Sequence, residues 1–300
     1  MKNFRNCKKK GLIFLLGLLL VFWFCSNAFA AGKSKTSRRK FNLTAKSILA
    51  LNLDNEEILY EKNSDEIRSI ASLTKLMTAM VFLESSTDFF GTETITRQDA
   101  YHSAKSGLRI GERFYLIDLF YASLMSSDNR ATRALVRATG MTQEEFVEKM
   151  NQKADSLGLL NTRFTDPTGL DMGNVSTARE CAQLLKVALS DPLIARITTT
   201  ESYKFYSLNK RWRIHNAANS NRLLRSDIEI LGGKTGFIGR SGWCLAVMLK
   251  NLEEKLCVIV LGASSNYRRF AEAKYILKSA LEKEYLEKLG SVQSSENIGQ

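Results

Sequence analysis

A serine and a lysine three positions apart can act together in acyl transfer, because residues i and i+3 share one face of a helix. A lysine held out of water titrates low enough to accept the serine proton. The chain contains this S-x-x-K pattern at Ser37–Lys40, at Ser207–Lys210 and at Ser72–Lys75. Only the last pair opens a strongly periodic apolar segment, ASLTKLMTAMVFLE. The pattern therefore selects Ser72 as the nucleophile and Lys75 as its base; the alternative is a capping serine beside a surface lysine.

A second motif, Ser127-Asp128-Asn129, follows the apolar run LFYASLM. A serine hydroxyl can relay protons, and an asparagine amide can orient a lysine and hold a substrate amide. The alternative is a helix cap, because all three residue types are favoured at N-caps. By itself the motif favours the cap, since other S-x-N matches such as Ser264-Ser265-Asn266 also occur.

A third motif, Lys234-Thr235-Gly236, stands at the end of a strand-like run. Lysine and threonine can bind a carboxylate, and a glycine lets a substrate approach the strand backbone closely. The similar tripeptide at 105–107 lacks a preceding strand-like run. The alternative for Lys234-Thr235-Gly236 is an ordinary turn that ends a strand.

Each motif is weak alone, but their order along the chain is that of serine β-lactamases and penicillin-binding proteins. The chain resembles the low-molecular-mass penicillin-binding proteins that act as serine D-alanyl-D-alanine peptidases. The likeness runs from about residue 40 to 285 and rests on the blocks SIASLTKLMTAM, LMSSDNRA, TRFTDPTGLDMGNVSTARE and GGKTGF. It implies an α+β transpeptidase-like fold, with an antiparallel five-stranded sheet and a helical subdomain.

The resemblance also implies roles for the motif residues in acyl transfer. Ser72 attacks the carbonyl of the penultimate D-alanine, with Lys75 as the base. Ser127 passes a proton to the leaving amine, and Asn129 positions Lys75 and the substrate. Water then hydrolyses the acyl-enzyme, and β-lactam antibiotics act as covalent inhibitors. Neither a metal ion nor an organic cofactor is implied.

The resemblance places the substrate beside the third motif. Lys234 and Thr235 hold the substrate carboxylate, and Gly236 leaves room beside the strand. The backbone N–H groups of Ser72 and Phe237 form the oxyanion hole, which is often the largest single contribution to acyl transfer. The partners implied are the stem peptides of peptidoglycan, and no nucleic acid.

Within the family the chain is most similar to the D-Ala-D-Ala endopeptidase branch, which cleaves 4→3 cross-links. LMSSDNRA and NVSTAR match that branch, and the chain ends after a helix at 267–289, without a further β-domain and anchor helix. Ser220 stands where many carboxypeptidases of the family carry an arginine, although Arg222 is close. The alternatives are a D-alanyl-D-alanine carboxypeptidase, a β-lactamase and a non-catalytic wall-binding protein.

The elements that must position these motifs follow from hydrophobic periodicity and turn residues. We expect strands at 46–53, 56–62, 228–236, 243–250 and 255–263, and helices at 72–86, 142–158, 177–189 and 267–289. A capping box of Thr142 and Glu145 starts the second helix, and Ser176 caps the third. Strands at both ends of the chain predict one sheet built from both termini, with a helical insert between them.

Composition excludes other chemistries. Among 300 residues only two are histidines, His102 and His215, so a His-rich metal site is nearly excluded and a Ser-His-Asp triad has little support. After the first 30 residues three cysteines remain. Cys244 and Cys257 lie in strand-like runs, so both buried free thiols and a disulfide between these two stay open, and Cys181 has no evident partner.

The N-terminal segment 1–30 has the pattern of a secretory signal peptide, with a basic start, an apolar run and the small-x-small sequence Ala28-Phe29-Ala30. An uncleaved membrane anchor is the alternative. Cleavage removes five basic residues and lowers the net charge from +12 to +7. We expect a periplasmic protein with a basic tail at 31–44, one catalytic domain at 45–289 with its helical insert at about 70–200, and a polar tail at 290–300. The basic tail is either a solvated segment or a weak contact with the wall or membrane.

Overall fold

The computed structural model describes residues 41–85, 88–103, 106–211 and 213–296. The expected signal peptide at 1–30, most of the basic tail and the S-x-x-K match at Ser37–Lys40 lie outside these residues. The contacts between residues divide the chain into two units, Met1–Asn42 and Leu43–Gln300, and the helices and strands that the structure describes belong to the second. Within the described ranges no helix is long and apolar enough to cross a membrane.

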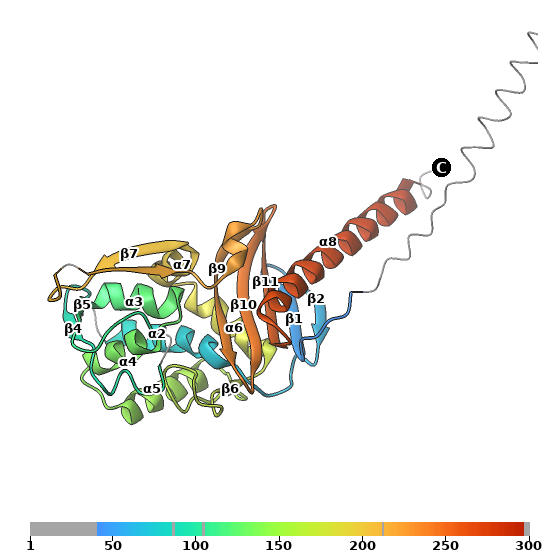
Figure 1. The fold of residues 1–300 in the computed structure, drawn as a ribbon. Helices are drawn as coiled ribbons and strands as arrows, with labels where there is room; N and C mark the ends of the chain where they lie inside the picture. The colour runs from blue at the N-terminus through green and yellow to red at the C-terminus, as the bar shows by residue number, and fades with distance from the viewer. Residues whose placement is uncertain (1–40, 86–87, 104–105, 212, 297–300) are drawn as a thin grey trace, which may run out of the picture. The chain divides into compact units, whose positions relative to one another are not determined.

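A five-stranded antiparallel sheet joins the two ends of this unit (Figure 1). Its strand order is β2 (Ile58–Lys62), β1 (Ser47–Asn52), β11 (Glu254–Ala263), β10 (Gly242–Asn251) and β9 (Glu229–Ile238). Strands β1 and β11 are neighbours, with Ser47 opposite Leu261, although about 200 residues separate them in the sequence. The expected sheet, the hairpin at its start and the three strands at its end are thus confirmed.

The sheet is buried on both faces, and alternate residues along a strand supply the two cores. On β10, Leu245 and Val247 pack in the cluster that includes Phe270 of α8 (Asn266–Glu296). The intervening residues Cys244 and Ala246 pack in the larger cluster formed with the helices. Figure 1 shows the sheet between α8 on one side and α2 and α6 on the other. Helix α8 extends beyond the expected end at residue 289.

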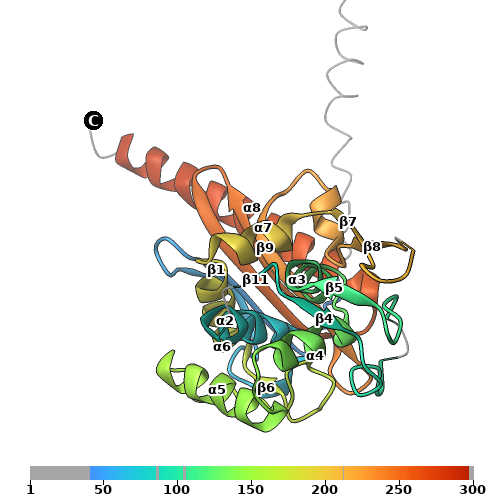
Figure 2. The same ribbon diagram turned by 90° about the vertical axis from the view of Figure 1, so that its left-hand side faces the viewer.

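The helical insert packs around one buried helix, α2 (Lys75–Ser85), whose residues from Lys75 to Phe82 are all buried. A short 3-10 helix, η1 (Ala71–Thr74), precedes it, so the α-helix starts three residues later than expected. Around it lie α3 (Leu116–Met125), α4 (Asn129–Ala138), α5 (Gln143–Ser156) and α6 (Ala178–Ala188), as Figure 2 shows. Helix α7 (Pro192–Thr199) packs against β9.

The helix starts show which local signals are reliable. Helix α5 has both hydrogen bonds of the expected capping box between Thr142 and Glu145. Helix α6 is capped by Thr177, whose hydroxyl accepts the N–H of Glu180, so the expected cap at Ser176 is wrong by one residue. Ser176 instead forms β6 (Val175–Ser176), and its hydroxyl shares a hydrogen bond with that of Thr162.

Three small antiparallel pairs were not expected from the sequence. They are β3 (Arg68–Ser69) with β6, β4 (Thr92–Thr94) with β5 (Arg113–Tyr115), and β7 (Ser202–Tyr206) with β8 (Ile214–Ala218). The three cysteines of this unit are buried and free, so the disulfide between Cys244 and Cys257 is not formed. Cys257 pairs with Met248 in the sheet rather than with Cys244.

Candidate active site

All three motifs open into one cleft of about 910 Å³ at the edge of the sheet. Ser72 enters it from η1, Ser127 from the connection between α3 and α4, Asn129 from the first position of α4, and Thr235 from β9. Residues separated by more than 100 positions in the sequence therefore line the same hollow. The other described S-x-x-K match, Ser207–Lys210, lies in the connection between β7 and β8.

Ser72 and Lys75 lie one helical turn apart and are in contact. The Oγ of Ser72 is 3.2 Å from the Nζ of Lys75. Lys75 is completely buried, and its Nζ also donates to Oδ1 of Asn129 at 2.7 Å and to the carbonyl oxygen of Thr168 at 2.5 Å. The alternative of a surface lysine is thus excluded.

Burial has the largest effect on the pKa of Lys75. It lowers the pKa of this amine from 10.5 to about 7, against the opposing effects of the Asp166 and Asp128 carboxylates, and the Arg133 guanidinium lowers it further. A neutral amine has two hydrogens and one lone pair. When the amine is neutral and donates its two hydrogens to the oxygens of Asn129 and Thr168, its lone pair is free to accept the hydroxyl proton of Ser72. This arrangement suits a general base for a serine nucleophile.

The Ser-Asp-Asn motif is both a helix cap and part of the cleft. Asp128 caps α4, because its side chain accepts the N–H groups of Arg130 and Ala131 at 2.9 and 3.1 Å. Ser127 has φ of +62°, a left-handed conformation that is costly for a residue with a Cβ. The cap and this turn direct the side chains of Ser127 and Asn129 into the cleft.

Lys234 links the second motif to the third. Its buried Nζ donates to Oγ of Ser127 and to the carbonyl oxygen of Thr235, both at 2.9 Å. Burial lowers the pKa of Lys234 well below its usual value, and the positive groups of Lys75 and Arg269 act in the same direction. An anionic ligand beside Lys234 would counter this effect, so the position favours binding of a carboxylate.

Thr235 follows Lys234 on β9 and lines the cleft. Its hydroxyl shares a hydrogen bond of 2.6 Å with the hydroxyl of Ser220, which also lies within 3.0 Å of the carbonyl oxygen of Met125. Ser220 is therefore held against the third motif. Arg222, two residues later, is exposed and is not among the residues that line the cleft. Ser220, rather than this arginine, therefore stands beside Thr235.

Gly236 has a structural task that the sequence did not indicate. A Cβ at this position would lie 2.9 Å from the carbonyl oxygen of Ile70 and 3.0 Å from the backbone nitrogen of Ser72. The missing side chain thus brings β9 against the segment that carries the nucleophile. The structure thus gives a packing reason for this glycine, and its expected place beside the substrate stays a prediction.

The loop from Asp166 to Asp171 was noticed only as a block of family likeness, and its contacts were missed. The carboxylate of Asp166 accepts the N–H groups of Thr168 and Gly169 at 3.0 Å, and that of Asp171 at 3.2 Å. This turn points the carbonyl oxygen of Thr168 at Lys75. The Asp-Pro-Thr-Gly sequence is a turn signal that could have revealed the loop, but not its target.

Arg269 is a second contribution that sequence reasoning missed. This buried side chain of α8 donates through Nη1 to the carbonyl oxygens of Gly236 at 3.0 Å and Cys244 at 3.1 Å, and through Nη2 to Asn266. It therefore joins β9 to β10 at the third motif. Its position at the start of an amphipathic helix carries no sequence signal for this contact.

The two histidines take no part in the hydrogen bonds around Ser72. His102 is exposed at the rim of the cleft, and His215 on β8 lies between the rings of Phe114 and Phe205. Among the described residues no cluster of three or more His, Cys, Asp or Glu side chains could hold a metal ion.

Residues 33–265 match the family model described as D-alanyl-D-alanine carboxypeptidase. The chain is 31% identical to the D-alanyl-D-alanine endopeptidase of Escherichia coli, over 87% of this chain and 85% of that protein. It is 33% identical to the endopeptidase of the same name from Pseudomonas aeruginosa, over 86% of each chain. It is 32% identical to the D-alanyl-D-alanine carboxypeptidase DacF of Bacillus subtilis, over 89% of this chain and 69% of that protein.

Solved structures show the same fold. The DD-transpeptidase of Streptomyces K15 superposes with a TM-score of 0.75 at 26% identity, over 81% of this chain and 99% of that chain. Penicillin-binding protein D2 of Listeria monocytogenes, in a cefotaxime-bound form, superposes with a TM-score of 0.71 at 26% identity, over 80% and 98% of the two chains.

Proposed function

Because the chain belongs to the D-alanyl-D-alanine carboxypeptidase family and is a serine DD-peptidase, we propose that it mainly cleaves the 4→3 cross-links between peptidoglycan stem peptides. The reaction proceeds through an acyl-enzyme on Ser72. The observation that carries the catalytic assignment is the buried Lys75, hydrogen-bonded to two oxygens and in contact with Ser72.

In the acylation step Ser72 attacks the carbonyl carbon of the D-alanine that precedes the scissile bond. Its proton passes to the neutral amine of Lys75, whose lowered pKa supports this role. The side-chain oxygen of Asn129 holds that amine in place, and its amide nitrogen binds the substrate backbone. No metal or organic cofactor enters this scheme.

Departure of the amine requires a proton and a fixed leaving group. The hydroxyl of Ser127 passes to the leaving amine the proton that Lys75 took from Ser72, and Lys234 holds this hydroxyl at 2.9 Å. Lys234 and the hydroxyl of Thr235 bind the carboxylate of the leaving residue. That carboxylate raises the pKa of Lys234 and keeps its ammonium charged while the substrate is bound.

The oxyanion of the tetrahedral intermediate is held by the backbone N–H groups of Ser72 and Phe237. The close contact of Gly236 with the nitrogen of Ser72 supports this assignment, because it brings the two N–H groups to adjoining segments. Two preorganised donors of this kind contribute strongly to acyl transfer. Water then attacks the acyl-enzyme and releases the donor peptide.

The preference for cross-links over terminal D-alanine rests on Ser220. A guanidinium beside Thr235 would grip the small terminal carboxylate of a pentapeptide in two hydrogen bonds. A serine leaves space for the larger leaving residue of a cross-link. Three relatives named endopeptidases, 31–33% identical, support this choice. Carboxypeptidase activity is the second candidate, supported by the likeness to DacF.

Digestion of purified sacculi tests the proposal. Residues 31–300 are incubated with sacculi that contain both cross-linked dimers and pentapeptide monomers, and the muropeptides are measured by mass spectrometry. Loss of dimers with retention of pentapeptides supports the endopeptidase, and the opposite result supports the carboxypeptidase. Ser72→Ala is the control. Rapid turnover of penicillin would indicate a β-lactamase, and no labelling by fluorescent penicillin would indicate a non-catalytic wall-binding protein.

We also propose that the segment 1–30 is a signal peptide and that the mature protein works in the periplasm. The sequence pattern that ends at Ala30 supports this. N-terminal sequencing of the exported protein should then begin at Ala31. Full-length protein retained in the membrane would instead indicate an anchor. The tail at 31–44 provides at most a weak electrostatic contact with the wall or membrane surface.

A further inference from the structure

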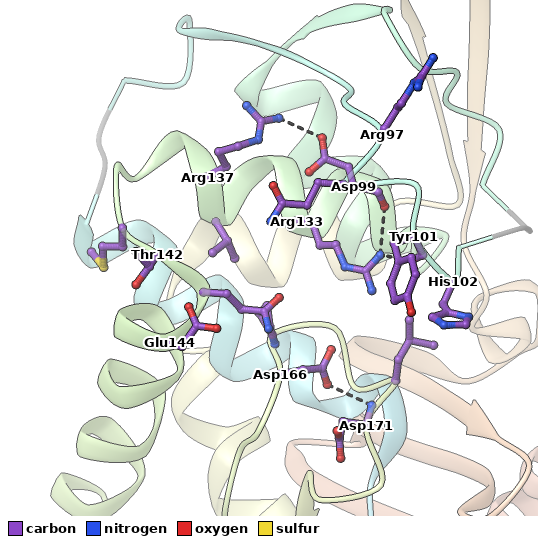
Figure 3. Close-up of a pocket in the computed structure, with 16 residues that line it drawn as sticks. Arg97, Asp99, Tyr101, His102, Arg133, Arg137, Thr142, Glu144, Asp166 and Asp171 are labelled. Atoms are coloured by element: carbon purple, nitrogen blue, oxygen red, sulfur yellow. Dashed lines mark hydrogen bonds and ion pairs between the residues drawn. The ribbon is translucent and has the colours of Figure 1, made fainter.

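A second cavity, of about 1170 Å³, adjoins the catalytic cleft (Figure 3). Its walls come from the segment 97–102, from α4, from the start of α5 and from the loop 166–171. His102 and Leu170 line both this cavity and the cleft, so the two hollows meet at these side chains. The cavity is larger than the cleft and is large enough for several residues of a peptide.

The cavity combines an apolar part with charged walls. Its apolar lining is formed by Val136, Met141, Pro167 and Leu170. Most charged groups on its walls are already neutralised or hydrogen-bonded. Arg137 is paired with Glu93 and Asp99, and the carboxylate of Asp166 accepts the backbone N–H groups of its own loop.

Arg133 differs from these groups. It is half-buried, and its Nη1 donates to the carbonyl oxygens of Asp99 and Tyr101, which fixes the guanidinium in place. Its Nε and Nη2 have no hydrogen-bond partner within the part of the chain that the structure describes. Figure 3 shows the guanidinium pointing into the cavity, between Tyr101 and Asp166. A fixed, partly desolvated guanidinium with spare donors is well suited to bind a carboxylate.

The position of Arg133 indicates which part of a substrate would reach it. Arg133 follows Asn129 by one turn of α4, and the lining of the cavity includes no residue of the Lys234-Thr235-Gly236 motif. The leaving residue is assigned to that motif. The portion of the peptide on the other side of the scissile bond therefore extends toward Arg133.

We propose that this cavity is the subsite for the stem peptide that precedes the scissile D-alanine, and that Arg133 binds a carboxylate of that peptide. Stem peptides are acidic, with free carboxylates on residues that precede the D-alanine. This proposal rests on the proposed function. It adds which part of the substrate is bound outside the catalytic cleft.

The test compares two cross-linked dimers as substrates. One carries free carboxylates on the donor stem, and in the other these carboxylates are amidated. For the wild type, kcat/KM should be roughly 10- to 100-fold higher for the free acid, the effect of one hydrogen bond between charged groups. In Arg133→Gln this ratio should fall to about one, and in Arg133→Lys it should be intermediate, because lysine supplies charge without the planar fork.

A second variant guards against a folding defect in Arg133→Gln. Gln98→Trp places a bulky ring in the cavity from its exposed wall and should also abolish the preference, mainly through a higher KM. Gln152→Trp on α5 is the matched control, because Gln152 is exposed and lies outside this cavity. It should keep the wild-type ratio.

The outcomes separate the subsite from the function. A wild type that cleaves both dimers equally well overturns the subsite and leaves the proposed function intact. A preference that persists in Arg133→Gln assigns recognition to another residue and also overturns the proposal. A wild type that cleaves neither dimer and is not labelled by fluorescent penicillin refutes the proposed function itself.

Discussion

Replacing Asp128 by asparagine should shift the acid limb of the pH–rate profile, in which the rate of Ser72 acylation rises with pH, to lower pH. The Asp128 carboxylate raises the pKa of Lys75, so removing its charge lowers that pKa further. Asparagine is as good an N-cap as aspartate, and its side-chain oxygen can still accept the N–H groups of Arg130 and Ala131. The substitution therefore changes the charge beside Lys75 while keeping the start of α4.

The magnitude follows from the pKa of Lys75. At pH 7 an ordinary lysine with a pKa of 10.5 is neutral in only about 0.03% of molecules. With a pKa of about 7, half of the molecules carry the neutral base, a gain of about a thousandfold. The wild-type acylation rate should rise about tenfold per pH unit below this pKa and then level off. The variant should be faster than the wild type on the acid limb and equal to it on the plateau.

The assay is the second-order rate of acylation by fluorescent penicillin, measured by stopped flow from about pH 5 to about pH 9 at constant ionic strength. Asp155→Asn is the matched control, because Asp155 is an exposed carboxylate on α5 with no effect on the pKa of Lys75. Two results would refute Lys75 as the neutral base. One is a wild-type acylation rate that rises with a midpoint near pH 10. The other is an Asp128→Asn midpoint that equals that of the wild type or lies at higher pH.

Three further outcomes are expected. Ser72→Ala should lose all labelling by fluorescent penicillin, whereas Ser207→Ala, at the S-x-x-K match between β7 and β8, should keep it; loss in both would contradict the choice of nucleophile. Gly169→Ala should lower the free energy of unfolding in urea by on the order of 3 kcal/mol, because its Cβ would lie 2.1 Å from a backbone carbonyl oxygen at a φ of +81°. Gly158→Ala, at a φ of +70° in open space, should cost only about 1 kcal/mol, and equal losses would exclude the clash. The folded state lowers the pKa of Lys75, so between about pH 7 and pH 10.5 the unfolded chain binds more protons than the folded one. Within this window wild-type stability should rise with pH by up to about 1.4 kcal/mol per unit relative to Lys75→Met, and parallel pH dependences of unfolding would contradict this.

Local sequence signals predicted much of the framework. The apolar runs along β1, β10 and β11 were sufficient to locate the sheet, because a strand buried on both faces has a nearly continuous apolar sequence. The capping box of Thr142 and Glu145 located the start of α5, since its hydrogen bonds join residues three apart. The order of the three motifs was sufficient to predict the family.

Local signals gave the wrong result where two adjacent residues could both cap a helix, and where a strand depends on contacts with distant segments. Ser176 and Thr177 are both good caps, and Thr177 caps α6 because Ser176 pairs with Arg68 in the small β3–β6 sheet. The β7–β8 hairpin was missed because its polar strands lack a clear alternation. Phe205 on β7 is buried, and its ring packs against that of Phe114 on β5, about 90 positions earlier in the sequence.

Residue type and spacing alone determined that Ser72 and Lys75 share a helical face, and the choice of candidates in all three motifs. The tertiary structure decided what those residues meet. Lys75 finds the carbonyl oxygen of Thr168, 93 positions away, and Lys234 finds Ser127, 107 positions away. Burial is a property of the packed chain and not of any sequence window. The lowered pKa of Lys75, on which the proposed chemistry depends, therefore arises only when the helices and the sheet close around it.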